Sequence, residues 1–116
     1  MLTEILNNLP MNEDYETDWF PLISESLYKN SKKATAESLQ ISWYNVTGTL
    51  NGTIELISSN DMENSVSGLS VRIDSSSNQS NAVLIVLLSV FRYFKLKYTK
   101  NGITNGSLSA VVAYSE

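Results

Sequence analysis

Apolar side chains recur at every second position over much of the chain from Leu39 onward, and this period restricts the fold most. Leu39, Ile41 and Trp43 alternate with polar residues, and the same alternation returns in 69–73 and 108–114. A two-residue period places apolar side chains on one face of a strand. Turn-forming Gly and Asn residues separate these stretches at intervals of about 8–12 residues, as in sandwiches. We therefore expect an all-β fold, an antiparallel and jelly-roll-like β-sandwich of about seven or eight strands.

Other segments refine this expectation. The stretch 19–23 predicts a first strand, which Pro21 confines to a sheet edge because proline cannot donate to a ladder. The polar stretch 24–36 predicts a short strand followed by a loop. Val83–Leu88 is continuously apolar, which predicts a strand buried on both faces. Near the C-terminus, Asn-Gly pairs at 101–102 and 105–106 predict that a tight connection lies between them.

The first twelve residues predict a short arm ahead of a sandwich domain that spans 13–116. Four apolar side chains in this arm fall at helical spacing, and Pro10 ends the pattern. So short a helix is marginally stable alone, so it must dock either on its own domain or on a neighbouring subunit. Its expected contact residues are Leu2, Ile5, Leu6 and Leu9.

The composition of the chain restricts the classes of function that it can have. The 116 residues suit one domain, and they include no cysteine and no histidine. These absences remove disulfides, thiolate metal ligands and the commonest general base near neutral pH. We therefore predict a non-enzymatic protein without cofactor or metal. A net charge of −4 predicts no nucleic-acid partner, and no apolar run is long enough to predict a membrane partner.

Two acidic segments are candidate sites. Ser58–Asp61 with Glu63 offers oxygen ligands for Ca²⁺, but Asn and Asp at a strand end more often form an Asx-turn. The cluster of Glu13, Asp14, Glu16 and Asp18 would need a cleft to perform acid–base chemistry. On a loop near a terminus, we interpret it instead as a solvated patch.

Three aromatic residues are candidate ligand-binding positions. Trp19 and Tyr44 could line a sugar-binding platform, whereas Trp43 follows the apolar alternation and is expected in the core. Tyr93 shares a strand face with Lys95 and Lys97, a pattern that could stack bases. Lysines on an outward strand face also prevent edges from aggregating. The acidic net charge favours this second interpretation.

Two stretches carry a family resemblance. From Trp43 to Asp61, a strand, a Gly-Thr turn and a second strand end in Ser-Asn-Asp. The stretch Phe91–Gly102, followed by Gly106-Ser107-Leu108, supplies a second pattern of aromatic and basic residues before a Gly-rich turn. Together, and in this order, they resemble small structural proteins of tailed bacteriophages.

This resemblance implies a β-sandwich virion component, such as a capsid decoration or auxiliary protein, a head fibre, or a neck or tail protein. It implies other virion proteins as partners, a homo-oligomer or symmetric assembly, and a location in a virion assembled in the bacterial host cytoplasm. On this view, deletion of residues 1–10 should leave a folded domain that no longer joins its assembly. The alternative function is a carbohydrate-binding or adhesive module, with a glycan as the ligand.

Overall fold

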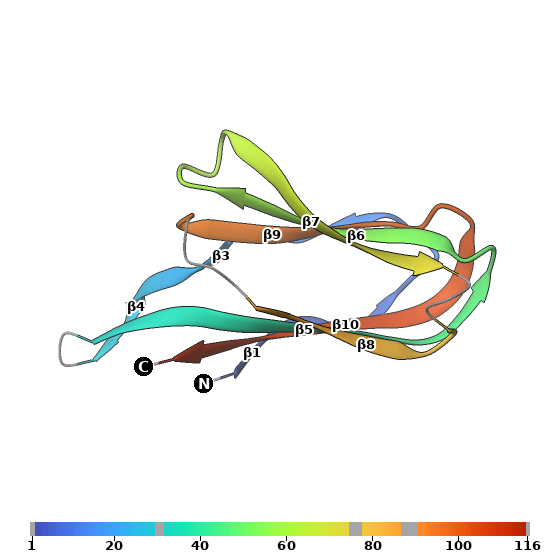
Figure 1. Ribbon diagram of the computed structural model, residues 1–116, viewed down its shortest axis with the longest axis horizontal. Coiled ribbons are helices and arrows are strands. Elements are labelled where there is room, and N and C mark those ends of the chain that lie inside the picture. The colour runs from blue at the N-terminus through green and yellow to red at the C-terminus, as the bar shows by residue number, and fades with distance from the viewer. Residues whose placement is uncertain (1, 30–31, 75–77, 87–90, 116) are drawn as a thin grey trace.

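The computed structural model describes residues 2–29, 32–74, 78–86 and 91–115, and these form ten β-strands without any helix (Figure 1). The strands are β1 (Leu2–Pro10), β2 (Tyr15–Glu16), β3 (Phe20–Pro21), β4 (Ile23–Lys29), β5 (Lys32–Gly48), β6 (Asn51–Ser59), β7 (Ser65–Asp74), β8 (Asn81–Val86), β9 (Tyr93–Thr99) and β10 (Ile103–Ser115).

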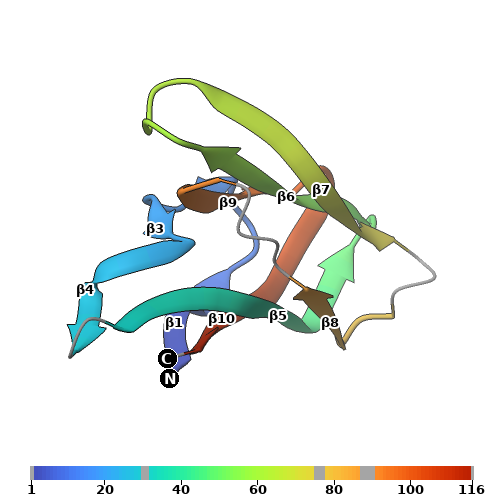
Figure 2. The ribbon, with the colours of Figure 1, turned by 60° about the vertical axis from the view of Figure 1, so that its left-hand side comes forward.

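The strands make two antiparallel sheets. Sheet A has the order β1-β10-β5-β4. β8 pairs with the edge of β5 that also pairs with β4, but further along this long strand. Sheet B has the order β2-β9-β6-β7, and β3 also pairs with β9. The two sheets lie face to face, and the two chain ends lie close together because β1 and β10 are neighbours (Figures 1 and 2). The predicted β-sandwich is confirmed, whereas the jelly-roll comparison stays a prediction.

The core forms where the inward faces of the sheets meet. Sheet A contributes Leu39, Ile41 and Trp43 of β5, all buried as their alternation predicted. β10 adds every second residue from Leu108 to Tyr114, and β9 adds those from Phe94 to Tyr98. Burying each large apolar side chain contributes roughly 1.5–3 kcal/mol. The two-residue rhythm therefore stabilises both sheets at once.

The two Asn-Gly pairs have different roles. Asn101 and Gly102 have φ values of 35° and 97°, and they form the tight turn between β9 and β10. The second pair does not bracket this connection, contrary to the prediction. Asn105 and Gly106 lie inside β10, where the pairing with β5 shifts register. A Cβ on Gly106 would stand 3.0 Å from Met11 Sδ. The glycine at this register shift therefore allows the segment around Met11 to lie close to β10.

The N-terminal segment is a strand, so the predicted helix is wrong. β1 pairs with β10, and its register shifts between Glu4 and Leu6 and again between Leu6 and Leu9. The extra residues of these shifts allow Leu6 and Leu9, three positions apart, to pair with inward-facing residues of β10. Asn8 adopts a positive φ of 52° within the second shift. Irregular strand geometry thus produced a spacing that resembles a helix.

Two further expectations need correction. β8 is an edge strand that pairs with β5 alone among the described residues, and Leu84 is 67% exposed rather than buried. Leu87 and Leu88, the end of the predicted central strand, lie outside the described residues. The polar stretch 24–36 is mostly strand, since β4 and the start of β5 pair there. The edge position of Pro21 is confirmed in β3.

Candidate docking surfaces

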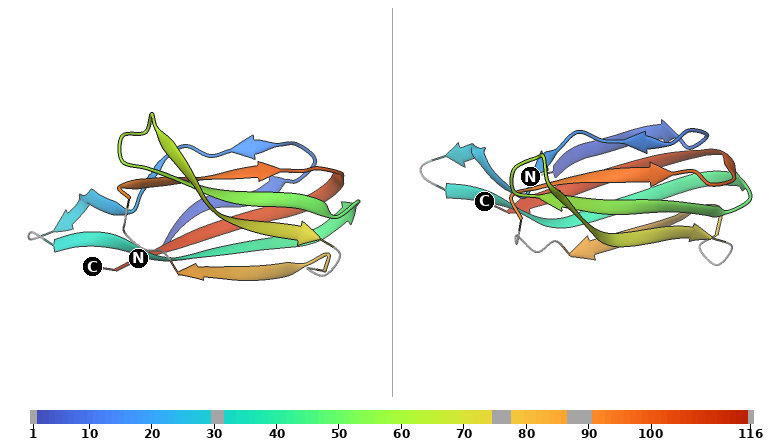
Figure 3. Two further views of the ribbon diagram at one scale, coloured as in Figure 1. Left: turned by 45° about the horizontal axis from the view of Figure 1, so that its top comes forward. Right: turned by 90° about the horizontal axis from the view of Figure 1, so that it is seen from above.

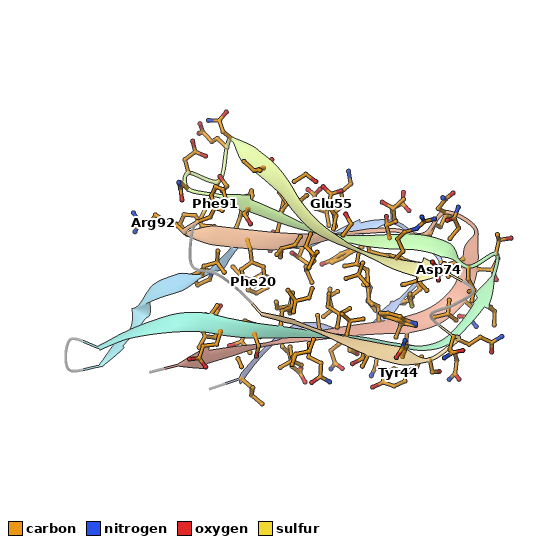
Figure 4. The ribbon with its side chains drawn as sticks, viewed as in Figure 1. Phe20, Tyr44, Glu55, Asp74, Phe91 and Arg92 are labelled. Atoms are coloured by element: carbon orange, nitrogen blue, oxygen red, sulfur yellow. The ribbon has the colours of Figure 1, made fainter. Side chains whose placement is uncertain are left out.

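The outward faces of the two sheets differ in charge. Sheet B presents three charged side chains on the face opposite the core: Glu55 pairs with Lys97 across β6 and β9, and Lys95 stands opposite Ile57 (Figure 4 labels Glu55). On sheet A, the residues that alternate with the core are small or uncharged, with Glu4 as the exception. We call them the serine-rich face, which comprises Leu2, Glu4, Ser38, Gln40, Ser42, Tyr44, Ala82, Leu84, Ser107, Ser109, Val111 and Ala113.

At the centre of the serine-rich face, the hydroxyls of Ser42 and Ser109 already take part in hydrogen bonds. Ser42 is buried between β10 and β8, where it pairs with Ser109 and Ala82. Gln40 Nε2 donates to Ser42 Oγ at 3.4 Å, and the Asn8 amide donates to Ser109 Oγ at 3.1 Å. Such a surface has no group arranged for chemistry, but it can approach another protein closely.

Exposed apolar side chains lie around this centre. Leu2 is 72% exposed on β1, Leu84 is 67% exposed on β8, and Tyr44 is 48% exposed on β5. Glu4 is the one charged member of the face, and exposed Glu37 stands at the neighbouring register shift of β5. Interface centres are depleted in charged residues and enriched in tyrosine. The serine-rich face therefore has the composition of a docking surface.

The four residues predicted as arm contacts lie in different environments. Leu6 is 6% exposed and belongs to the core, while Ile5 and Leu9 pack against that core. Only Leu2 of the four remains open to a partner. Three of the four side chains therefore cover this chain's own sandwich, one of the two alternatives left open by the sequence. Docking of this segment on a neighbour stays a prediction.

Tyr44 lies at one end of the serine-rich face. Trp43 is fully buried, as expected, and its Nε1 donates to the Asn78 carbonyl at 3.4 Å. Asn45 follows with a positive φ of 53°, and its amide donates to Ser80 Oγ at 3.0 Å. This bond fixes the backbone directly after Tyr44, whose ring points outward from sheet A (Figure 4).

Trp19 and Tyr93 lie on the other sheet. Lys95 Nζ stands 4.6 Å from the centroid of the Trp19 ring and 2.9 Å from Glu16 Oε2. Tyr93 is half-buried and pairs with Pro21 and Ser59. The structure therefore does not join Tyr44 and Trp19 into one sugar-binding platform. Lys95 already binds a carboxylate and an aromatic ring, so it is not presented for a phosphate.

Asp61 organises the turn between β6 and β7. Its Oδ1 accepts hydrogen bonds from the amides of Asn64 at 2.8 Å and Glu63 at 2.9 Å, and from Ser59 Oγ at 3.0 Å. The Asn64 backbone and side chain are the main cause of a pKa well below the usual range of an aspartate. This is the expected Asx-turn arrangement. Among the described residues, no three acidic side chains gather in a way that could hold a metal ion.

The acidic cluster lies along the edge of sheet B where β2 and β3 pair with β9. Glu13, Asp14, Glu16 and Asp18 are all exposed. Asp14 Oδ1 accepts a hydrogen bond from the Lys100 amide at 2.9 Å. Between Glu16 and Asp18, Thr17 is buried, and its Oγ1 accepts a hydrogen bond from the Leu96 amide at 3.0 Å. The backbone is thus tied down while the carboxylates face solvent, as expected for a solvated patch.

Some exposed apolar residues were not predicted. Leu84 was expected to be buried, and Val66 and Leu69 of β7 are each 53% exposed. Composition alone could not find them, since an exposed and a buried strand leucine look alike in sequence. Knowledge of which strands stand at sheet edges would have found all three, because β7 and β8 are both edge strands.

The fold and surfaces define an antiparallel β-sandwich with a weakly charged outer face on one sheet. Comparison with known proteins finds no matching family model, no matching curated protein and no matching solved structure. Among the described residues, no helix is long and apolar enough to cross a membrane. Function must therefore be argued from this chain's own residues and from the sequence resemblance described above.

Proposed function

We propose that this chain is a structural subunit of a phage virion, an auxiliary or decoration protein that attaches to the capsid or its appendages through protein–protein contacts. The serine-rich face is the observation that carries this proposal. Its position opposite the charged face of sheet B gives the domain one side suited to a partner and one suited to water.

The energetics support docking through this face. Its central hydroxyls already have hydrogen-bond partners within the domain, so covering them costs less than covering open polar groups. Leu2 and Leu84 can each contribute roughly 1.5–3 kcal/mol when fully buried. Tyr44 adds an amphipathic ring of the kind enriched in binding hot spots. Repeated over a symmetric particle, contacts of this size give firm attachment.

The strand order is compatible with the proposal. In sheet A the strands run β1-β10-β5-β8, and in sheet B they run β3-β9-β6-β7. The chain crosses between the sheets at most of its strand connections, although β2-β3, β4-β5 and β6-β7 each stay within one sheet. This order is compatible with a jelly roll, an architecture that recurs in viral capsid and lectin domains. Because one fold hosts many functions, it supports both the virion proposal and its alternative. The chemistry of the serine-rich face must separate the two.

Cosedimentation with particles tests the proposal. The purified chain should pellet with virions from its source, and mass spectrometry should find the native chain in those virions. Ser109→Lys places a charge at the centre of the serine-rich face and should abolish pelleting. Glu55→Lys places the same side chain on the outward face of sheet B and should leave pelleting intact. Absence of the chain from purified virions would refute the function, whereas equal binding by both variants would refute only the surface.

The alternative is carbohydrate binding, and the exposure of Tyr44 favours it. The ring stands 48% exposed beside a backbone fixed by the bond from Asn45 to Ser80. A glycan array distinguishes the two functions, because a virion subunit should give no signal. Selective signals that disappear in Tyr44→Ala would establish the adhesive module instead.

A further inference from the structure

β8 has the composition of a central strand but stands at a sheet edge. Its sequence, Asn81–Val86, is apolar on both faces beyond its first residue and contains no charged side chain. Strands of this composition are usually covered on both faces and paired on both sides. Here Ile85 is buried and Val83 half-buried on the inner face, while Leu84 is exposed on the outer face.

Each other edge of the sandwich carries features that discourage pairing. β1 has two register shifts, Glu4 and Pro10. β2 and β3 are each two residues long, and β3 ends in Pro21. β7 is interrupted by a register shift and carries Arg72 and Asp74, and β4 also shifts register. Bulges, prolines, charges and short length are the usual devices that protect sheet edges. β8 has none of them, since its six residues pair with β5 in uninterrupted register.

The backbone of β8 presents hydrogen-bonding groups at this edge. The Ala82 amide donates to Oδ1 of the preceding residue, Asn81, at 2.8 Å, and from this contact we infer that it points away from β5. Strand alternation then turns the amide and carbonyl of Leu84 in the same direction. The open edge of sheet A therefore offers at least one donor and one acceptor at the exposed leucine.

We propose that β8 pairs antiparallel with β8 of a second copy of this chain around a twofold axis, which makes sheet A continuous across the dimer. With Leu84 opposite Leu84 of the second copy, the two residues exchange both backbone hydrogen bonds. Their side chains meet on the outer face, at the roughly 4.5–5.5 Å Cβ separation of cross-strand pairs. On the inner face, Val83 comes opposite Ile85 of the second copy, so the apolar core extends through the seam.

Self-pairing is favoured by charge. The chain carries a net charge of −4, which opposes most approaches of one copy to another. The uncharged β8 strand meets no like charge across a twofold axis. Figure 3 places β8 at the edge opposite β1 and the acidic segment 13–18, so the dimer keeps the two acidic clusters apart. A self-complementary strand is what an isologous interface requires.

The interface is small, so the dimer should be weak and dependent on concentration. With Leu84 on the axis, residues 82–86 of each copy pair, and five paired residues a side bury less than the roughly 1,200–2,000 Å² of a stable interface. Sedimentation velocity over a wide concentration range is the appropriate measurement. We expect the wild-type mass to rise from monomer to dimer, without any virion component present, so this result is independent of the proposed virion function.

Three substitutions test the geometry. Leu84→Lys should weaken association at least about tenfold, because two lysines would meet at the axis. Leu84→Pro removes the outward amide together with the leucine side chain, and it should have the same effect while β5 and β8 remain paired. Leu2→Lys makes the same change at the exposed leucine on the opposite edge of sheet A and should associate as the wild type does. Circular dichroism shows which variants are folded, and Leu84→Lys carries the test if the proline variant unfolds.

Three results would overturn the proposal. A wild-type chain that stays monomeric at the highest soluble concentration has no such pairing. Dimers that persist in folded Leu84→Lys do not use this edge. A loss of dimer in Leu2→Lys equal to that in Leu84→Lys would place the contact on the serine-rich face, with the sheets packed face to face.

Discussion

Leu6 should be an anchor of the fold, and its truncation tests whether the N-terminal segment belongs to this chain's own sheet. Leu6 is 6% exposed, pairs with Ala110 of β10 and packs in the core. Replacing a buried leucine by alanine costs about 2–5 kcal/mol. Because Leu6 lies on an edge strand, where the cavity can partly relax, we expect Leu6→Ala to cost about 2–3 kcal/mol, at the low end of that range.

Leu2→Ala is the matched control. Leu2 lies four residues earlier on the same strand and is 72% exposed. Its truncation should change the free energy of unfolding by no more than about 0.5 kcal/mol. The two substitutions remove the same atoms from one strand, so the difference between them measures burial against this domain.

Urea unfolding followed by the fluorescence of buried Trp43 gives both values. With an m-value near 1–3 kcal/mol/M, Leu6→Ala should lower the midpoint by roughly 0.7–3 M at unchanged m. Equal and negligible effects of both substitutions would refute the reasoning, since the segment would then contribute nothing to its own domain. The same reasoning predicts that deletion of residues 1–10 destabilises the fold more than Leu6→Ala does. The truncated domain expected from the sequence should therefore be difficult to keep folded.

Three further predictions concern particular contacts. Ionised Asp61 should stabilise the fold above about pH 4 and lose this effect as the pH falls, because its pKa is lowered in the folded state. The difference in free energy of unfolding between wild type and Asp61→Asn should therefore be larger at about pH 6 than at about pH 2.5. A difference that does not change with pH would contradict this prediction. Tyr98→Phe should cost about 1–3 kcal/mol in urea unfolding, because the Tyr98 hydroxyl donates to the Met11 carbonyl at 2.8 Å. Burial raises the pKa of Tyr98 to about 12, so the wild type should also lose stability between about pH 10 and 12. This loss should be smaller in the phenylalanine variant, which keeps only Tyr114 as a tyrosine whose pKa is clearly raised by burial. Gly48→Ala should cost more than about 1 kcal/mol in a thermal melt, because Gly48 has a φ of 99° and an added Cβ would lie 2.5 Å from the Gly102 carbonyl oxygen. Gly68→Ala should cost less in the same assay, because Gly68 has a negative φ and an added Cβ would make one contact at 3.1 Å.

The sequence predicts the sandwich because its central strands are regular. In β5, Leu39, Ile41 and Trp43 alternate without interruption, and each is buried. β9 and β10 follow the same rule. Such strands have neighbours on both sides and one face on the core, so local pattern and tertiary environment agree. Their apolar face can be read from the sequence without knowledge of the pairing.

Edge strands are where sequence reasoning failed. In β1, two register shifts set Leu6 and Leu9 three positions apart on the core side, and this spacing imitates a helix. In β8, an apolar run predicts a central strand, whereas the position of a strand in a sheet depends on contacts far away in sequence. A local pattern cannot encode either fact.

The candidate sites were predictable as individual residues but not as surfaces. The sequence assigned Trp43 to the core and Tyr44 to the surface, and the structure agrees. It could not show that Trp19 and Tyr44 lie on different sheets. The serine-rich face gathers residues from four strands, and only the register of β1, β10, β5 and β8 brings them together.

The pairing of the two chain ends within sheet A is the central claim about the serine-rich face, and nuclear Overhauser effects between strands test it most directly. The structure predicts cross-strand contacts between Leu6 and Ala110, and between Val112 and Leu39, with extended-backbone couplings throughout residues 2–6. Helical contacts between residues three and four apart within 2–9, or no contact between residues 2–10 and β10, would contradict the account.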